Sequence, residues 1–183
     1  LFLSILNSTN PYFIIGGQTF GAVAIKMAGI EAISTGYLVV APGGAAGWMS
    51  DTKPLLREKP EIAVAYALAA QYMGFKLIYL EAGSGVANSV PLKMISKVKK
   101  FIDIPMIVGG GVDTPKNARD KVLAGADIIV QGTFIEENIM RDNGASLEKI
   151  IQAIKEAGKK KIGSETELKT TSVAEGKSIQ AQD

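Results

Sequence analysis

Two residue types are missing from this 183-residue chain, and each absence removes a class of chemistry. Without cysteine, the chain has no disulfide, no thiolate nucleophile and no cysteine zinc site. Without histidine, it lacks the usual proton carrier near neutral pH and the commonest metal ligand. Any acid, base or metal ligand in these residues is therefore Asp, Glu, Tyr, Lys or a backbone group. That inventory favours chemistry with magnesium and phosphate over hydrolysis by a catalytic triad.

Charge and hydropathy exclude further classes. The formal net charge is only +2 and the lysines are scattered, so nothing indicates nucleic-acid binding. The sequence has no run of about 18 uncharged apolar residues, so it predicts no transmembrane segment. It also has no basic region followed by a small-residue cleavage site, so it predicts no signal peptide. With 47% apolar and 21% charged residues, the composition is typical of a soluble globular core, and we expect a cytoplasmic protein.

Short apolar runs alternate with longer helical patterns along the chain. The runs are 1–6, 37–40, 76–79, 106–108 and 127–130, and the helical patterns are 12–28, 60–73, 90–101, 114–124 and 146–157. Continuous apolar strands separated by helices predict a parallel α/β sheet that helices cover. No GxGxxG motif stands at a strand–helix junction, and the regular rhythm favours a TIM barrel over a Rossmann sheet.

Only five strand–helix units are visible, whereas a complete barrel has eight. The sequence therefore predicts a modified (β/α)8 TIM barrel whose first three strand units are missing from this chain. Leu1 is not a methionine and already belongs to a strand-like run, so we expect those units to precede it. We assign residues 1–163 to the partial barrel domain. Residues 164–183 lose their apolar residues, which predicts a disordered tail.

Glycines cluster after three consecutive predicted strands. The clusters are GSG at 83–85, GGG at 109–111 and Gly132 followed by Thr133. In such a barrel the active site lies at the carboxyl ends of the strands, and phosphate often binds after the last two. Glycine lets backbone N–H groups approach an anion closely. A single cluster is equally well explained by a tight turn, but three on consecutive strands predict a phosphate-binding cup.

The motifs YLEAGSG (79–85), VGGGV (108–112) and QGT (131–133) occur in this order together with GYLVVAPGGAAGW (36–48) and LNSTNPYFIIGGQ (6–18). In order and spacing they closely resemble geranylgeranylglyceryl phosphate synthases, which are archaeal prenyltransferases of the PcrB-like family. The resemblance covers nearly all of residues 1–140. It implies a modified TIM barrel that joins geranylgeranyl diphosphate to sn-glycerol 1-phosphate and releases diphosphate, the first ether-bond step of archaeal membrane phospholipid biosynthesis.

The resemblance also implies a set of ligands for glycerol phosphate. Carried over position by position, the predicted ligands are Tyr79, Leu80, Glu81, Ala82, Gly83, Ser84, Gly85, Gly110, Gly111, Gly132 and Thr133. Family members bind Mg²⁺ through an Asp and a second ligand on early strands, and neither has a counterpart here. We therefore assign no metal ligand to this chain, expect the Mg²⁺ ligands in the missing N-terminal part, and expect these 183 residues alone to be inactive. The family is usually homo-oligomeric.

Two other interpretations remain open. The chain is either another phosphate-binding barrel enzyme, such as one acting on a sugar or indole phosphate, or a non-catalytic phosphate-binding remnant. The carboxylate in YLEAGSG and the GYLVVAPGGAAGW loop argue against the first, while the expected missing units leave the second open. Within the favoured interpretation, Glu81 has two candidate roles. It accepts the proton of the attacking glycerol hydroxyl, or it only orients the glycerol diol.

Several other residues have a functional and a structural interpretation. Asp113 resembles a metal ligand, but its place before Thr114 and Pro115 favours helix capping. A loop with Asp51, Lys53, Arg57 and Lys59 is either a mobile cover that meets diphosphate or, as we favour, a solvated loop.

Aromatic and apolar residues also have both a functional and a structural interpretation. Trp48 fits a lid or interface as well as burial against a helix. The run Tyr12, Phe13, Ile14 and Ile15 lines a prenyl groove or, as we favour for most of it, packs as helix core.

Overall fold

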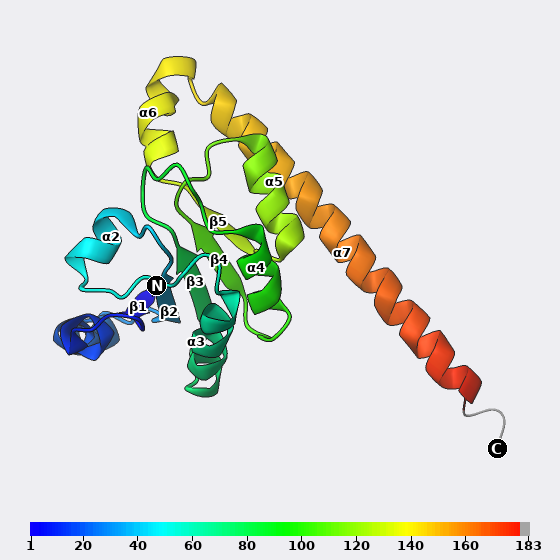
Figure 1. Ribbon diagram of the computed structural model, residues 1–183, viewed down its shortest axis with the longest axis horizontal. Coiled ribbons are helices and arrows are strands. Elements are labelled where there is room, and N and C mark those ends of the chain that lie inside the picture. Colours follow the sequence, from blue (N-terminus) through cyan, green and yellow to red (C-terminus); the bar gives the residue numbers. More distant parts are fainter. Residues whose placement is uncertain (180–183) are drawn as a thin grey trace.

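Five parallel strands form one sheet at the centre of the protein (Figure 1). The structure is a computed structural model that describes the backbone of residues 1–179 and the side chains of residues 1–163. The strands are β1 (Phe2–Ile5), β2 (Ser34–Val39), β3 (Leu77–Glu81), β4 (Met106–Gly109) and β5 (Ile128–Val130). Their order in the sheet, β1-β2-β3-β4-β5, follows the chain. Consecutive barrel strands have this order, whereas the order of a Rossmann sheet reverses. The predicted strand–helix alternation is thus confirmed.

Helices connect the strands largely where the sequence predicts them. They are η1 (Tyr12–Gly16, a π-helical turn), α1 (Gly17–Met27), α2 (Gly44–Met49), α3 (Pro60–Tyr72), α4 (Leu92–Lys99), α5 (Pro115–Ala124), α6 (Thr133–Asp142) and α7 (Ala145–Ile179). Proline stands in the first turn of both α3 and α5, where its missing N–H costs nothing. The Thr114 hydroxyl accepts the Asn117 N–H at 3.1 Å and caps α5. The helices α2 and α6 are not predicted.

The hydrophobic core lies between the sheet and three helices. Figure 1 shows α3, α4 and α5 on one side of the sheet and α2 on the other. Leu38, Leu80 and Val108 of the strands are fully buried against Ala67 of α3 and Met94 of α4. Strands β3 and β4 are buried along almost their whole length, as expected for the inner strands of a covered parallel sheet. The core therefore fixes the strands whose ends carry the glycine loops.

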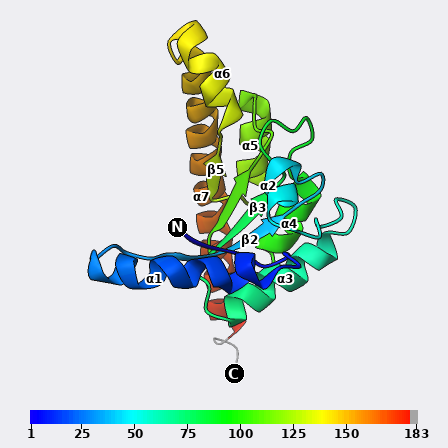
Figure 2. The ribbon, with the colours of Figure 1, turned by 90° about the vertical axis from the view of Figure 1, so that its left-hand side faces the viewer.

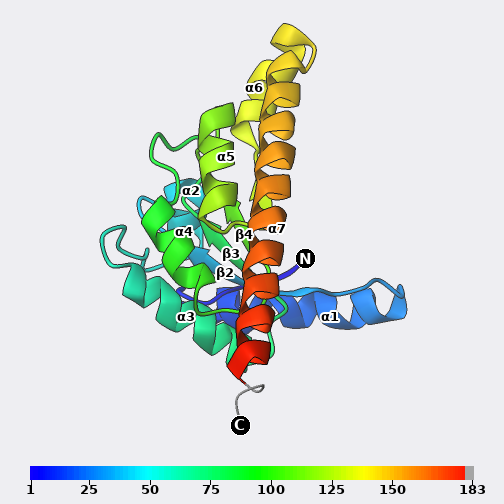
Figure 3. The same cartoon turned by 90° about the vertical axis from the view of Figure 1, so that its right-hand side faces the viewer.

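The long helix α7 packs along α5, whereas α1 extends away from the sheet and runs crosswise to α7 (Figures 2 and 3). The Asp127 carboxylate, just before β5, links α4 to α7. It accepts from Lys99 of α4 at 2.7 Å and from Lys161 of α7 at 2.8 Å. Although α7 has 35 residues, no helix within the described backbone is long and apolar enough to cross a membrane.

The structure differs from the prediction of a disordered tail. The backbone continues as α7 through residues 164–179, where the polar composition predicts disorder. The segment has no proline, and its three Glu and two Lys residues have good helix propensity. Residues 180–183, the end of the predicted tail, lie outside the described residues.

Candidate functional site

The parallel register brings three strand ends to one edge of the sheet. Glu81, the last residue of β3, pairs with Gly109 of β4, and Gly109 pairs with Val130 of β5. A glycine-containing loop leaves the sheet directly after each of these residues. Loops that are far apart in the sequence therefore meet at the carboxyl ends of the strands, where barrel enzymes place their sites.

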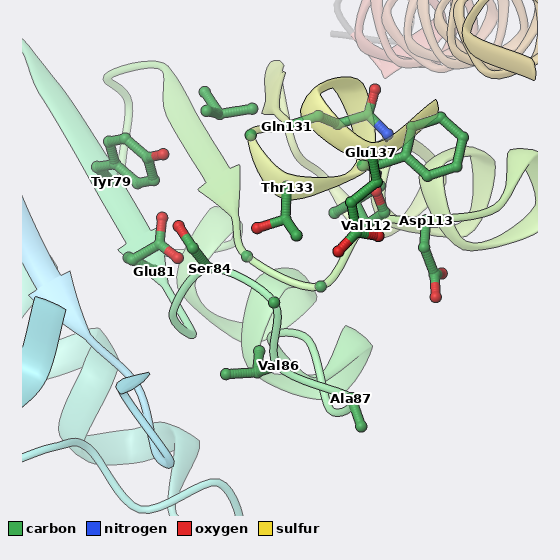
Figure 4. A pocket seen from close by; sticks show the side chains of 16 residues that line it. Tyr79, Glu81, Ser84, Val86, Ala87, Val112, Asp113, Gln131, Thr133 and Glu137 are labelled. Atoms are coloured by element: carbon green, nitrogen blue, oxygen red, sulfur yellow. Dashed lines mark hydrogen bonds between the residues drawn. The ribbon is translucent and has the colours of Figure 1, made fainter. Parts of the chain in front are cut away.

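The three loops surround a cavity of about 320 Å³. Most of the predicted ligands line it: Tyr79, Glu81, Ser84, Gly85, Gly110, Gly111, Gly132 and Thr133. Figure 4 shows the side chains of Glu81 and Ser84 together at one end of the cavity and Thr133 between them and Asp113. The structure thus brings together residues of all three predicted glycine clusters.

Three predicted ligands lie outside the lining of this cavity. The side chains of Leu80 and Ala82 are fully buried in the hydrophobic core. They point there because successive strand residues face opposite sides of the sheet, so Tyr79 and Glu81 face the cavity. Gly83 contacts the site indirectly, since its N–H donates to Oε1 of Glu81 at 2.6 Å.

Glu81 is a buried carboxyl group at the end of the cavity, with 6% of its surface exposed. Burial disfavours its charged form and raises its pKa above the ordinary range for Glu. The Gly83 N–H and the hydroxyls of Tyr79 and Tyr37 donate to the carboxylate and offset part of this effect. The carboxylate is therefore held in place by donors, and its raised pKa makes it a stronger base than an exposed Glu.

Tyr37 and Tyr79 form the wall beside Glu81. Their rings lie 4.8 Å apart at 58°, because the two residues pair directly across β2 and β3. Burial, followed by the charge of Glu81, raises the pKa of both hydroxyls far above neutral pH. Both phenols therefore stay protonated and donate to the carboxylate.

The loop after β4 approaches the loop after β3 so closely that side chains are excluded. Gly110 has φ of 80°, and a Cβ there would lie 2.5 Å from Oε1 of Glu81 and 2.5 Å from the carbonyl oxygen of Gly83. Gly111 has φ of 62°, and its Cβ would lie 2.6 Å from the carbonyl oxygen of Val86. Both positions require glycine. Successive N–H groups in such a loop form a concave site for an anion.

The third wall of the cavity is the N-terminus of α6. Gly132 is its N-cap residue and Thr133 its first residue. The carbonyl oxygen of Gly132 accepts from the Ile135 N–H at 2.9 Å and from the Glu136 N–H at 3.2 Å, which forms the first turn. The first N–H groups of a helix and its dipole favour a bound anion.

Part of the lining is absent from the predicted ligands, namely Val86, Ala87, Val112, Asp113, Val130, Gln131, Phe134 and Glu137. Gly109, which belongs to the predicted GGG cluster but not to the predicted ligands, also has no room for a side chain, since its Cβ would lie 2.5 Å from the Tyr79 hydroxyl oxygen. Phe134 and Glu137 enter the site because α6 starts at the strand end. The helical spacing of Ile135 and Ile139 after Gly132 is the signal that indicates this helix. The lining holds carboxylates but no lysine or arginine among the described side chains.

Three structural interpretations made from the sequence are wrong. Asp113 does not cap α5, because Thr114 occupies the capping position. Trp48 is not buried against a helix, since 81% of its surface is exposed. The preference for helix core fails at Tyr12 and Ile15, which are 52% and 60% exposed.

The interpretation of the loop after α2 as solvated agrees with three of the four charged residues on which it rests. Asp51, Lys53 and Lys59 are exposed, as a solvated loop requires, but Arg57 is only partly exposed. Its guanidinium donates to the carbonyl oxygens of Ala41, Asn88 and Ser89.

A second, more apolar cavity of about 390 Å³ lies beside β1 and β2, on the face of the sheet that carries Tyr37 and Tyr79. Leu3, Ile5, Tyr12, Phe13 and Tyr37 contribute to its lining. Because the Tyr37 ring also contacts Tyr79, the apolar cavity and the glycine-lined cavity share a wall. The alternative that places Tyr12 and Phe13 in a groove therefore gains support.

The side chains described, those of residues 1–163, do not fit a magnesium site. Among them, no group of three or more His, Cys, Asp or Glu could hold a metal ion. Glu81 already accepts from the Gly83 N–H through Oε1 and from two tyrosine hydroxyls, so donors and not a second carboxylate surround it. We therefore assign metal chemistry to none of these residues.

Comparison with known proteins identifies the relatives of this chain. The PcrB family model matches residues 1–158. The geranylgeranylglyceryl phosphate synthase of Thermococcus sibiricus is 53% identical over 156 residues, which are 85% of this chain and 61% of that protein. The synthase of Thermococcus kodakarensis is 57% identical over 136 residues, 74% of this chain and 54% of that protein. The chain thus spans roughly three fifths of the length of these relatives.

Solved structures give the same result for the fold. The structure of (S)-3-O-geranylgeranylglyceryl phosphate synthase from Thermoplasma acidophilum in complex with sn-glycerol-1-phosphate superimposes with a TM-score of 0.81 at 40% identity, covering 85% of this chain and 62% of that one. The wild-type synthase from Thermoplasma volcanium gives a TM-score of 0.79 at 44% identity, covering 85% and 61%. The five-stranded sheet therefore has the TIM-barrel-like fold of these synthases, and the chain belongs to the PcrB family.

Proposed function

We propose that the protein containing this chain joins geranylgeranyl diphosphate to sn-glycerol 1-phosphate and releases diphosphate, the first ether-bond step of archaeal phospholipid biosynthesis. The observation that carries this proposal is the cavity in which three glycine loops face one buried carboxylate, Glu81. Membership of the PcrB family and the likeness to a relative solved in complex with sn-glycerol-1-phosphate support it.

Backbone groups bind the phosphate in this proposal. The N–H groups of Gly110 and Gly111 and the N-terminus of α6 supply donors, and the hydroxyls of Ser84 and Thr133 add two more. This mode suits a lining without lysine or arginine among the described side chains, because helix dipoles and N–H groups attract an anion without a charged side chain. The glycerol part then extends toward Glu81, at the Ser84 end of the cavity (Figure 4).

Glu81 contacts the reacting hydroxyl. In the reaction a glycerol hydroxyl oxygen forms a bond to the allylic carbon, the bond from that carbon to diphosphate breaks, and the hydroxyl proton leaves. A carboxylate with a raised pKa is suited to accept that proton, and one fixed by three donors is suited to orient the glycerol diol. The proposal includes contact with the hydroxyl in either role, and the experiment below separates the two.

The prenyl chain occupies the apolar cavity bounded by Leu3, Ile5, Tyr12 and Phe13. Burial of an isoprenoid against these side chains is favourable by about 25 cal/mol for each Å² removed from water. Tyr37 borders this cavity and, through Tyr79, the glycerol phosphate cavity. The reactive end of the prenyl chain therefore has a short path to Glu81.

Magnesium, a cytoplasmic location and a homo-oligomeric assembly stay predictions. Since the described residues do not fit a metal site, no step of the proposed reaction is assigned to metal. We expect Mg²⁺ to bind outside these residues, where it would supply positive charge to a diphosphate.

A prenyl transfer assay of the complete protein tests the function and the role of Glu81. We expect ether product from geranylgeranyl diphosphate, sn-glycerol 1-phosphate and Mg²⁺. If Glu81 is the base, Glu81→Gln lowers kcat sharply and the affinity for glycerol phosphate little. If it orients the diol, the affinity falls and selection between glycerol phosphate enantiomers relaxes. The exposed Glu58→Gln is the control. Binding of glycerol phosphate without any product would favour the non-catalytic remnant, and turnover of a sugar or indole phosphate would favour another barrel enzyme.

A further inference from the structure

The segment 82–91 between β3 and α4, called the β3–α4 loop below, has two sides with different contacts. Its first half supplies Ser84, Gly85, Val86 and Ala87 to the glycerol phosphate cavity. Its second half borders another cavity of about 360 Å³, which Arg57 and Lys121 also line. The loop is therefore a wall with the candidate site in front and three basic side chains behind, of which Lys116 is paired with Asp120.

Arg57 joins the β3–α4 loop to the end of β2. One guanidinium nitrogen donates to the carbonyl oxygens of Ala41 and Asn88, each at 3.0 Å, and the other donates to that of Ser89 at 2.7 Å. Hydrogen bonds from a charged donor are stronger than those from a neutral one. The planar guanidinium also fixes the direction of each bond. One side chain therefore sets the position of two consecutive loop peptides.

Lys121 of α5 continues the same row of contacts. Its Nζ donates to the carbonyl oxygen of Val90 at 3.0 Å, and the side chain is 99% buried. Burial, followed by the nearby charge of Arg57, lowers its pKa to about 8, while Asp113 and Asp120 act in the opposite direction. Three consecutive carbonyl groups, those of residues 88–90, thus accept from two basic side chains.

The position of the β3–α4 loop determines the position of the next loop. A Cβ on Gly111 would lie 2.6 Å from the carbonyl oxygen of Val86 and 3.2 Å from the backbone nitrogen of Ser89. The side-chain amide of Asn117 donates to the carbonyl oxygen of Gly111 at 2.9 Å and holds the other side of that residue. Because the backbones are in contact, a shift of residues 86–89 moves the N–H groups of Gly111 as well.

We propose that Arg57 and Lys121 are positioning residues that hold the β3–α4 loop against the loop after β4, and that Arg57 thereby sets the affinity for glycerol phosphate without touching it. The identity of that ligand rests on the proposed function. Pulling the carbonyl groups of Asn88 and Ser89 outward turns the opposite side of the same planar peptides, the N–H groups of Ser89 and Val90, toward the loop after β4. The two cations also place positive charge behind a wall whose front face, within the described side chains, carries none.

Substitutions of Arg57 in the complete protein test this proposal. We expect Arg57→Met to weaken the binding of sn-glycerol 1-phosphate about 10-fold in calorimetry, while KM for the prenyl diphosphate changes less than about twofold. Arg57→Lys should recover part of the affinity, since its ammonium group reaches fewer of the three carbonyl groups. Arg119→Met removes the same charge from an exposed position of α5 and should leave both constants unchanged. Hydrogen exchange of residues 82–91 without ligand should be faster in Arg57→Met and unchanged in Arg119→Met.

Two results would overturn the positioning role. One is an Arg57→Met enzyme that binds glycerol phosphate as tightly as the parent. The other is an equal loss of affinity for both substrates, which indicates general destabilisation. If Arg57→Met does not fold, Arg57→Lys decides. Weaker binding of glycerol phosphate in Arg57→Lys but not in Arg119→Met supports the positioning role, and unchanged binding in Arg57→Lys contradicts it. If the parent itself binds no glycerol phosphate, the proposed function fails, and the exchange rate of residues 82–91 alone decides on the positioning role.

Discussion

Replacement of Gly110 by alanine tests how the loops after β3 and β4 form the candidate site. Gly110 combines a φ of 80° with a tight environment, because an added Cβ would lie 2.5 Å from both Oε1 of Glu81 and the carbonyl oxygen of Gly83. It would also lie 2.8 Å from the nitrogen of Gly83, whose N–H donates to Glu81. The new methyl group therefore displaces the carboxylate, the Gly83 peptide or the loop after β4.

The cost has two parts. The left-handed conformation costs a residue with a Cβ about 1–2 kcal/mol. Separating the buried Gly83 N–H from the Glu81 carboxylate costs about 1.5–3 kcal/mol more, because the acceptor is charged. Part of this cost lowers the free energy of unfolding, and part lowers the affinity for ligand because the site is displaced. We expect the affinity of the complete protein for sn-glycerol 1-phosphate to fall by about 2 kcal/mol, which is roughly 30-fold.

Calorimetric titration of three variants beside the parent checks this value. Gly74→Ala has the same left-handed strain, with φ of 88°, but nothing lies within 4 Å of its new Cβ, so it controls for strain alone. It should lower the melting temperature and leave affinity unchanged. Gly132→Ala has φ of −122° and equally open space, so any loss of affinity there comes from the ligand itself. Affinity that falls equally in Gly110→Ala and Gly74→Ala, or in neither, would refute the reasoning.

Two further predictions concern carboxylates whose pKa values are shifted. Glu81 has a raised pKa because of burial, so its contribution to stability is present below the ordinary Glu pKa and is lost as pH rises through the folded value. Thermal unfolding across pH should show this decline in the parent and a flatter profile in Glu81→Gln, and identical profiles would contradict it. Burial acts to raise the pKa of Asp127, but hydrogen bonds from Lys161 and Lys99 outweigh it and lower the pKa. Its contribution is present above the ordinary Asp pKa and lost as pH falls through the folded value, so Asp127→Asn should cost about 1 kcal/mol in urea unfolding at neutral pH, because solvent screens its partly exposed ion pairs, and less in acid. A cost that does not change with pH would contradict it.

The sequence predicts the parts of the site that depend on local pattern. Apolar runs ending in glycine locate the ends of β3, β4 and β5, and the parallel fold then requires Glu81, Gly110 and Gly132 to meet. Strand alternation also distinguishes Tyr79 from its neighbour Leu80, although the motif as a whole suggests that both contact ligand. These features are predictable because each depends only on residues close in sequence and on the general geometry of parallel sheets.

Contacts across the sheet and between loops cannot be predicted in this way. Tyr37 donates to Glu81 only because β2 and β3 pair in a register that places it opposite Tyr79. Arg57 stands in a polar segment that indicates a solvated loop, yet its partners Asn88 and Ser89 are more than thirty residues away. Its role depends on the distance between two loops, which is determined by packing of the entire sheet and not by local composition.

Hydrogen exchange of the complete protein with and without sn-glycerol 1-phosphate is the most direct measurement of the central claim. The account predicts slower exchange on ligand binding in residues 82–87, 110–112 and 131–134, the three loops around Glu81. It predicts no such change in residues 12–18, which border the apolar cavity. Protection confined to residues 12–18, or absent from two of the three loops at saturating ligand, would contradict the claim that the strand-end loops form the glycerol phosphate site.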